Sequence, residues 1–215
     1  MHLKRQKTPK NWPIPRKGTP YIVRPNFNIN KGLPILIILR DILKVAQNRK
    51  EVKKALVSKH ILLNNKVVRE ESHNALLFDV IKIIPSKKNY RVEILENKKF
   101  GIKEIKENEA DSKTVRVINK KILKGKKTQI NLSDGSNFLS EIDCKTNDSI
   151  IINLKKRSID KCLPLKEKTN AVILEGKHSG KKGIINKIDT KNKIAEVNVE
   201  KNKINVLIKQ LMVVK

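Results

Sequence analysis

One stretch, residues 32–84, constrains the fold of this chain more than any other part of the sequence. Pro34 stands where the first turn of a helix accepts a residue without an N–H group. Apolar residues then recur at helical spacing: Ile35, Leu39, Ile42 and Ala46. Asn48 and Glu51 have the spacing of an N-cap residue and its reciprocal partner, so they predict the start of a second helix.

The second predicted helix has one apolar and one basic side. Val52, Ala55 and Leu56 share the apolar side. Lysines three and four positions apart share the opposite side: Lys50, Lys53 and Lys54. Apolar runs at 61–63 and 67–68 then flank two asparagines, which tolerate positive φ and predict a tight hairpin turn at Asn64-Asn65. A further strand is expected over 77–84.

Two short helices and a hairpin, with lysines on the exposed side of the second helix, resemble the alpha-L RNA-binding motif. That motif is found in some ribosomal proteins, pseudouridine synthases and tRNA synthetases, so the resemblance implies that this stretch binds RNA. The alternative is a small α+β core whose lysines are merely solvated. The candidate RNA-binding residues here are Arg40, Arg49, Lys50, Lys53, Lys54, Lys66 and Arg69.

The charge balance favours a polyanionic partner. Lysine and arginine number 49 against 21 aspartates and glutamates, a net charge of +28. Such a field attracts polyanions, and since the excess extends over the whole chain, nucleic acid is the expected partner on several sides. An acidic membrane surface is the alternative, but no apolar run reaches the roughly 18 residues of a spanning helix.

Residues 1–32 read as a basic, extended arm. Five prolines lie between Pro9 and Pro25, and proline blocks helix interiors. With few apolar residues, the arm is expected to be disordered in isolation. Trp12 and Tyr21 could pack on a domain or stack on a base, and packing is the favoured interpretation. The candidates for phosphate contacts are His2, Lys4, Arg5, Lys7, Lys10 and Arg16.

Residues 98–168 predict a small basic β domain, either a barrel or a sandwich. Residues 114–118 alternate in the way of a strand, and residues 128–132 run into the turn pair Asp134-Gly135. An apolar run over 149–154 predicts another strand. One short helix is expected within 104–113.

A glycine pattern marks residues 169–215. The sequence AVILEGKHSGKKGIINKI looks like a KOW motif, the strand–loop–strand core of a small SH3-like barrel in ribosomal proteins and transcription elongation factors. A phosphate-binding P-loop is rejected, because the spacing is one residue short and Lys182 stands where a hydroxyl is required. A glycine hairpin with solvated lysines is the alternative to RNA contact. The candidate contacts are Gly176, Lys177, His178, Gly180, Lys181 and Lys182.

Four segments together resemble one family. HLKRQKTPKNW is similar to the opening of the fourth small-subunit ribosomal protein of the archaeal and eukaryotic (e) type, and PILIILRDILKVAQNRKEVKKAL, NNKVVREESHNALLFDVIKI and KGKKTQINLSDGSNF are similar to its later parts. The resemblance implies a multi-module α+β chain. Its expected modules are an extended arm (1–32), a helix-turn-helix plus hairpin RNA-binding domain (33–97), a central β-rich domain (98–168) and an SH3-like KOW barrel (169–215).

The family implies a structural constituent of the small ribosomal subunit that serves translation in the cytoplasm. Its expected partners are small-subunit rRNA and neighbouring ribosomal proteins, with no membrane and no small-molecule substrate. Since eukaryotic members are longer, an archaeal or otherwise reduced source is expected. A KOW-containing transcription or ribosome-assembly factor that binds RNA transiently is the alternative.

Catalysis and cofactors are not expected. Cys144 and Cys162 are too far apart in sequence for a paired metal site, and the four histidines are scattered. The Gly-Arg-Leu-Asp context of pseudouridine synthases is missing, as is any arrangement of nucleophile and base. Seven aromatic residues offer no platform for stacking bases, so recognition is expected to rest on phosphates and on the shape of folded RNA.

Overall fold

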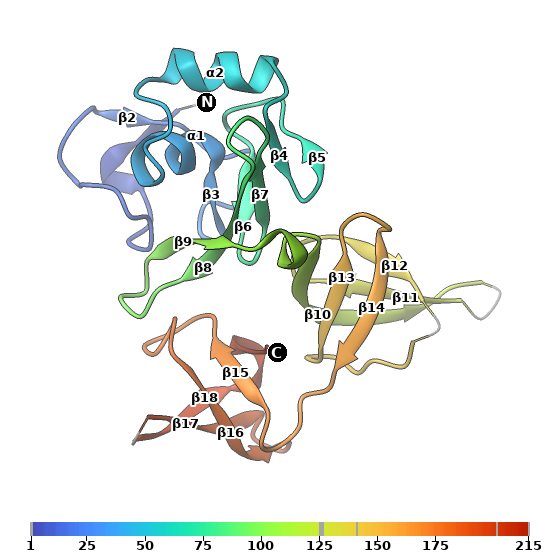
Figure 1. Ribbon diagram of the computed structural model, residues 1–215. Coiled ribbons are helices and arrows are strands. Elements are labelled where there is room, and N and C mark those ends of the chain that lie inside the picture. The colour runs from blue at the N-terminus through green and yellow to red at the C-terminus, as the bar shows by residue number, and fades with distance from the viewer. Residues whose placement is uncertain (1, 125–126, 141, 201, 215) are drawn as a thin grey trace. The chain divides into compact units, whose positions relative to one another are not determined.

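The computed structural model describes residues 2–124, 127–140, 142–200 and 202–214. The chain forms two compact units, residues 1–111 and 112–215, and each is described by itself. Strands predominate in both, and the helices are few and short (Figure 1). No helix of the described ranges combines the length and the apolar character needed to span a bilayer.

The amino-terminal segment is folded within the first unit, and the expectation of disorder for the segment in isolation stays a prediction. Strand β1 (Leu3–Lys4) pairs antiparallel with β2 (Tyr21–Ile22), and one 3-10 turn, η1 (Arg5–Lys7), follows β1. Trp12 is 2% exposed, and its Nε1 donates a hydrogen bond to the carbonyl of Ile29 (3.2 Å). The segment supplies enough apolar surface to offset its ordering entropy, from Leu3, Trp12, Ile14, Ile22, Val23 and Ile29.

The first predicted helix is shorter than its apolar pattern. Strand β3 (Gly32–Pro34) leads into α1 (Ile35–Ile37), which continues as a π-helical turn, η2 (Ile38–Ile42). Pro34 is the N-cap residue and not part of the first turn, because its backbone is extended (ψ 142°) where β3 pairs with β6 (Asn74–Leu76). Ala46 lies beyond the helix.

The second predicted helix is confirmed as α2 (Arg49–Val57), and Asn48 caps it. Its Oδ1 accepts a hydrogen bond from the backbone N–H of Glu51 (3.0 Å). The Glu51 carboxylate accepts from the N–H of Gln47 (2.7 Å), one residue before the position expected for a capping box.

A five-stranded antiparallel sheet follows in the order β5-β4-β7-β8-β9 (Figure 1). Its strands are β4 (Ile61–Leu63), β5 (Lys66–Val67), β7 (Val80–Ile83), β8 (Lys88–Ile94) and β9 (Phe100–Ile105). Asn64 and Asn65 have φ of 51° and 61°, which confirms the predicted turn. The strand expected from residue 77 begins only at Val80, because a turn at Phe78 (φ 62°) precedes it. The Asp79 carboxylate stabilises this turn by accepting a hydrogen bond from the N–H of Leu76 (2.7 Å). Since β9 pairs with β8, the sheet extends beyond residue 97, where the sequence placed a boundary.

The helix expected within 104–113 is a single 3-10 turn, η3 (Glu107–Glu109). Strand β9 ends at Ile105 and β10 begins at Ser112, so only a short segment is left between them. The apolar faces of α1, η2 and α2 pack with this sheet and with Trp12 in one core.

The second unit contains two five-stranded antiparallel sheets. The first has the order β12-β11-β10-β13-β14 and consists of β10 (Ser112–Ile122), β11 (Thr128–Leu132), β12 (Asn137–Leu139), β13 (Ser149–Asn153) and β14 (Ser158–Leu163). Strand β11 spans the predicted residues, and Gly135 (φ 84°) forms the predicted turn. Part of the resembling segment KGKKTQINLSDGSNF, Gly125 and Lys126, lies outside the described residues.

The second sheet of this unit has the order β18-β17-β16-β15-β19. It consists of β15 (Asn170–Ile173), β16 (Lys182–Asp189), β17 (Ile194–Val199), β18 (Asn202–Leu207) and β19 (Leu211–Val213), with a 3-10 turn η5 (Ile208–Gln210) before β19. The N–H of Val213 donates to the Ser149 hydroxyl (2.9 Å), a buried hydrogen bond that joins this sheet to β13.

Candidate nucleic-acid interface

A hollow of about 430 Å³ opens on the first unit, where the arm meets η2, α2 and the segment before β6. It brings together three of the predicted RNA-binding residues, His2, Arg40 and Arg49. Tyr21, Arg24 and Glu71 also line it. Arginines outnumber carboxylates in this lining, so the hollow suits an anionic ligand.

Two arginines of the hollow are held by carboxylates. Arg40 donates from Nε (3.2 Å) and Nη2 (2.9 Å) to the two oxygens of Asp41. Arg49 donates from Nε (2.8 Å) and from Nη2 to Glu71 Oε1. These hydrogen bonds, and secondly the charge of Glu71, raise the pKa of Arg49. Both guanidinium groups are therefore fixed in orientation by hydrogen bonds from two nitrogens each.

The backbone around Glu71 fixes this carboxylate in place. The carbonyls of Glu71 and His73 accept hydrogen bonds from the first residues of the helix, Leu36 (3.1 Å) and Ile35 (2.9 Å). Glu70 accepts from Asn26 Nδ2 (2.7 Å), and this bond is the main cause of the lowered pKa of Glu70. Glu71, only 9% exposed, thus joins the helix start to α2, and its neighbour Glu70 bonds to the arm.

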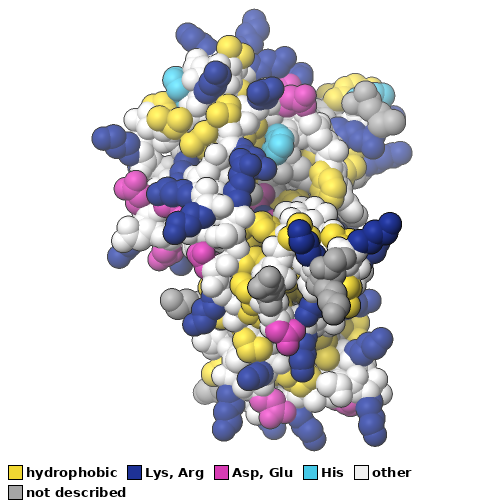
Figure 2. All heavy atoms as spheres, turned by 90° about the vertical axis from the view of Figure 1, so that its right-hand side faces the viewer, with side chains coloured by type: hydrophobic (Ala, Val, Ile, Leu, Met, Phe, Trp, Pro, Cys, Tyr) yellow, Lys and Arg dark blue, Asp and Glu magenta, His cyan; other side chains and the backbone are white. Residues whose placement is uncertain are grey.

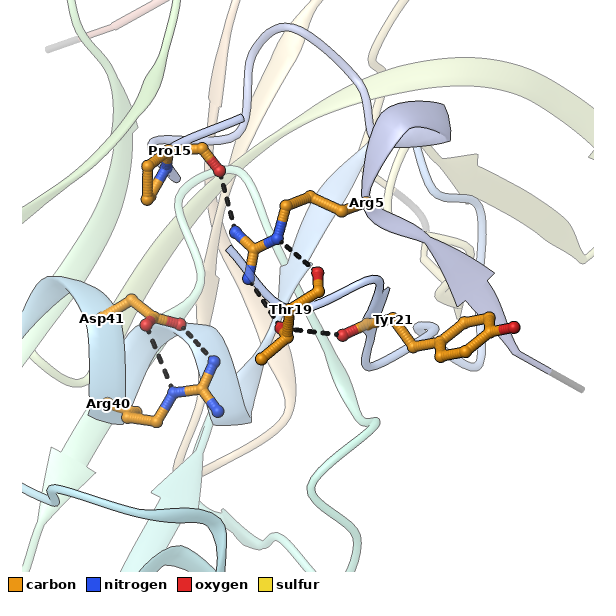
Figure 3. A network of polar contacts seen from close by, with 6 residues as sticks. All are labelled: Arg5, Pro15, Thr19, Tyr21, Arg40 and Asp41. Atoms are coloured by element: carbon orange, nitrogen blue, oxygen red, sulfur yellow. Dashed lines mark hydrogen bonds and ion pairs between the residues drawn. The ribbon is translucent and has the colours of Figure 1, made fainter. Parts of the chain in front are cut away.

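Arg5 organises the arm itself. Figure 3 shows its guanidinium aimed at the turn that runs from Pro15 to Thr19. It donates to the carbonyls of Thr19 (2.7 Å) and Pro15 (2.8 Å) and to the Thr19 hydroxyl (2.8 Å). That hydroxyl in turn donates to the carbonyl of Tyr21 (3.2 Å). Arg5 therefore places the β2 edge of the hollow.

The basic side of α2 is open to solvent. Lys50, Lys53 and Lys54 are exposed, and no described residue pairs with them, while Val52 and Leu56 are buried on the opposite side. Lys66 and Arg69, on and after the β5 strand, are exposed as well. The remaining predicted cations of the arm are also exposed, namely Lys4, Lys7, Lys10 and Arg16. Figure 2 shows how far Lys and Arg side chains outnumber Asp and Glu over the visible face.

The glycine loop, residues 174–181, connects β15 to β16 in the second unit, and Lys182 is the first residue of β16. Gly176 (φ 96°) and Gly180 (φ 90°) lie in the region that favours glycine. The Ser179 hydroxyl donates to the carbonyl of Leu174 (2.8 Å), and the N–H of Gly180 donates to the carbonyl of Ile173 (2.8 Å). The backbone is thus ordered. Lys177 and Lys182 are exposed, and His178 and Lys181 are half-buried.

Sequence reasoning missed two charged residues of the hollow, Arg24 and Glu71, and for Tyr21 it favoured packing over an exposed role. Trp12 packs in the core, as favoured, but Tyr21 is 56% exposed and meets the His2 ring edge to face, with centroids 4.9 Å apart. The pairing of β1 with β2 brings these two rings together. Because β1 and β2 are only two residues long each, no alternation pattern could have announced that pairing.

Comparisons with known proteins agree with one another. Two family models match the chain, Ribosomal family S4e over residues 86–159 and the RS4NT (NUC023) domain over residues 1–27. Small ribosomal subunit protein eS4 of Methanocella arvoryzae is 36% identical over 190 residues, which are 87% of this chain and 80% of the relative. The protein of the same name from Methanospirillum hungatei is 38% identical over 191 residues, 86% and 78% of the two chains.

One solved structure shares the fold. The crystal structure of the 30S ribosomal protein S4e from Thermoplasma acidophilum matches with a TM-score of 0.74 at 22% identity. The match covers 86% of this chain and 95% of that one.

Proposed function

Because this chain belongs to the family of small ribosomal subunit protein eS4, we propose that its basic surfaces bind and stabilise folded rRNA. The chain is a structural constituent of the small ribosomal subunit and not an enzyme. The alternative of a transient transcription or assembly factor is not favoured by these relatives. Neighbouring small-subunit proteins are its further partners.

The basic side of α2 is the observation that carries the proposal. Three lysines project from a capped helix whose other side is anchored by Val52 and Leu56. A helix fixed in this way presents three ammonium groups on its exposed side, where they can contact phosphates of an RNA backbone. The lysines are point charges without bidentate geometry, which suits phosphate contact more than reading of bases.

The finer architecture belongs to the same proposal. We assign the alpha-L motif to α1, η2, α2, β4 and β5, since this is the order of two helices and a hairpin. We assign the KOW motif to β15, the glycine loop and β16, in an antiparallel five-stranded sheet of the SH3-like kind. The division into segments 1–32, 33–97, 98–168 and 169–215 remains a working description of these modules.

Binding of this kind releases condensed counterions from the RNA. Each phosphate that is neutralised contributes about 0.9 to the slope of log K against log salt on a duplex. Six or more such contacts would therefore lower the affinity by roughly three or more powers of ten from low to physiological salt. By binding, the protein stabilises a compact RNA fold at cellular salt, and it catalyses no reaction.

The test compares two triple variants in filter binding to small-subunit rRNA at several salt concentrations. Changing Lys50, Lys53 and Lys54 to alanine should lower the affinity roughly a hundredfold at about 0.15 M salt and reduce the salt slope by about 2.7. The matched control changes Lys98, Lys99 and Lys103, three exposed lysines around the β8–β9 turn, and removes the same charge. Equal losses in both variants would show that only net charge matters and would refute a defined α2 contact.

A further inference from the structure

The hollow on the first unit is lined by an aromatic ring and by aliphatic side chains, which phosphate contacts alone would not require. We propose that it binds one unstacked nucleotide of rRNA, with the base against the Tyr21 ring and the phosphate at Arg40 and Arg49. This inference rests on the proposed rRNA binding and adds to it a site for a single base. For Tyr21 it takes up base stacking, the alternative to the packing that the sequence favoured.

The size and lining of the hollow suit one nucleotide. Its volume of about 430 Å³ lies within the roughly 300–1,000 Å³ of small-ligand sites. Ile22, Val23 and Leu36 supply an aliphatic part, and the hydroxyl residues Thr19 and Ser72 also line it. A nucleotide has the matching division into a flat apolar base, a hydroxylated sugar and an anionic phosphate.

The cationic side of the hollow is placed before any ligand arrives. Arg40 and Arg49 each use Nε and Nη2 for a carboxylate, and their Nη1 groups make no contact with a described residue. Each guanidinium has five N–H donors in a fixed plane. The Nη1 donors are therefore available to a phosphate at little cost in side-chain entropy.

The aromatic side is open as well. Tyr21 is 56% exposed although its backbone is held in β2, and its hydroxyl bonds no described residue. Figure 3 shows the ring extending away from the Arg5 contacts that fix the chain around it. His2 meets the ring edge to face, with an interplanar angle of 83°. A ring in this position offers a face to a base, and stacking of this kind accepts any base.

The test measures binding of the full chain to three RNA probes. These are the trinucleotide ApApA, the same trinucleotide without its middle base, and a blunt RNA duplex. Tyr21→Leu should weaken ApApA binding about tenfold, since a stacked base contributes roughly 1–3 kcal/mol and tenfold corresponds to about 1.4 kcal/mol. It should leave duplex binding unchanged. Removal of the middle base should weaken binding to the native chain by a similar factor, and to Tyr21→Leu hardly at all.

Phe27→Leu is the matched control, because Phe27 is 54% exposed but does not line the hollow. Both substitutions remove an exposed ring, so neither should alter thermal unfolding. Arg40→Gln should reduce the salt slope of ApApA binding by about 0.7, the value for one phosphate of a single strand. Equal effects of Tyr21→Leu and Phe27→Leu on ApApA binding would overturn the proposal.

Two further outcomes separate this inference from the proposed function. AMP should bind much more weakly than ApApA, and equal affinity would mean that the hollow serves a free nucleotide and not rRNA. If the α2 lysine variant loses rRNA while Tyr21→Leu binds ApApA as the native chain does, the nucleotide site fails and the rRNA function stands. If the native chain binds no rRNA at all, the proposed function fails first.

Discussion

The hollow of the first unit and the glycine loop of the second are both basic, but the protein holds their cations differently. In the hollow, carboxylates of Asp41 and Glu71 fix the guanidinium groups of Arg40 and Arg49. In the glycine loop, hydrogen bonds fix the backbone, through Ser179 and Gly180 among others, and leave the Lys177 ammonium to solvent.

The difference indicates two kinds of recognition. Guanidinium groups of fixed orientation select a ligand by geometry, because their N–H donors cannot move to meet a phosphate at another position. Lysines on an ordered loop adapt to phosphates at various positions and mainly neutralise charge. We therefore expect the hollow to confer specificity for one RNA position and the glycine loop to confer salt-dependent affinity.

The largest effect on stability is expected at the buried ion pair of Lys113. Lys113 is 4% exposed and donates to Asp134 Oδ2 (2.7 Å). Asp134→Asn removes the carboxylate that pairs with Lys113 and should lower the free energy of unfolding of the second unit by about 3 kcal/mol. Chemical denaturation followed by circular dichroism measures this. If the free energy of unfolding falls by less than about 1 kcal/mol, the Asp134 carboxylate is not needed to stabilise the buried Lys113 ammonium.

The pH dependence of the same pair has a defined sign. Burial alone would raise the pKa of Asp134, but the charge of Lys113 and hydrogen bonds from Lys113 and Ser136 outweigh it, so this pKa is lowered. The carboxylate therefore stabilises the fold above the unfolded pKa of about 3.9, and this contribution is lost as the pH falls through the folded pKa. The stability gap between the native chain and Asp134→Asn should narrow below about pH 4.

Strand β16, which follows the glycine loop, packs closely against β17 at Gly183. A Cβ there would lie 2.3 Å from the carbonyl oxygen of Asn198 on β17, so β16 and β17 would have to separate. Gly183→Ala should destabilise the unit by about 2–3 kcal/mol. Gly135→Ala is the control, since a Cβ at Gly135 meets nothing within 4 Å and adds only backbone strain of about 1 kcal/mol. Thermal unfolding that ranks the two variants in reverse would contradict the close contact.

The salt slope separates the two regions directly. Changing Lys177 and Lys181 to alanine should reduce the slope for rRNA binding by about 1.8 and the affinity about thirtyfold at about 0.15 M salt. The control changes Lys191 and Lys193, which are exposed in the turn after β16, to alanine. It should reduce both the salt slope and the affinity less than the loop variant does. Tyr21→Leu should leave the slope as it is. A loop variant with an unchanged slope would remove the glycine loop from the interface.

The smallest effect on stability is expected for Arg5→Lys, which keeps the positive charge but removes the planar set of guanidinium donors. Three hydrogen bonds to Pro15 and Thr19 depend on those donors. The arm should loosen by about 1–1.5 kcal/mol, seen as faster amide exchange at Gly18, Thr19 and Tyr21. Arg16→Lys is the control, because Arg16 is exposed and contacts no described partner. Equal exchange in both variants would mean that Arg5 does not organise the arm.

The sequence predicted local structure better than it predicted which cations are engaged. Asn48 and Asn64-Asn65 act through neighbours a few residues away, so their cap and turn could be read from spacing. Arg49 and Glu71 are 22 residues apart, and only the packed fold brings them together. Nothing in the sequence distinguishes such an arginine from a solvated one.

The order of strands in the second unit also has a consequence for synthesis. Strand β19 pairs with β15 and donates the Val213 N–H to Ser149, so this sheet is complete only when residues 211–213 have been made. Every strand of the first unit finds its partner within residues 1–111. Because domains fold as the nascent chain emerges, we expect the first unit to fold while the second is still being synthesised.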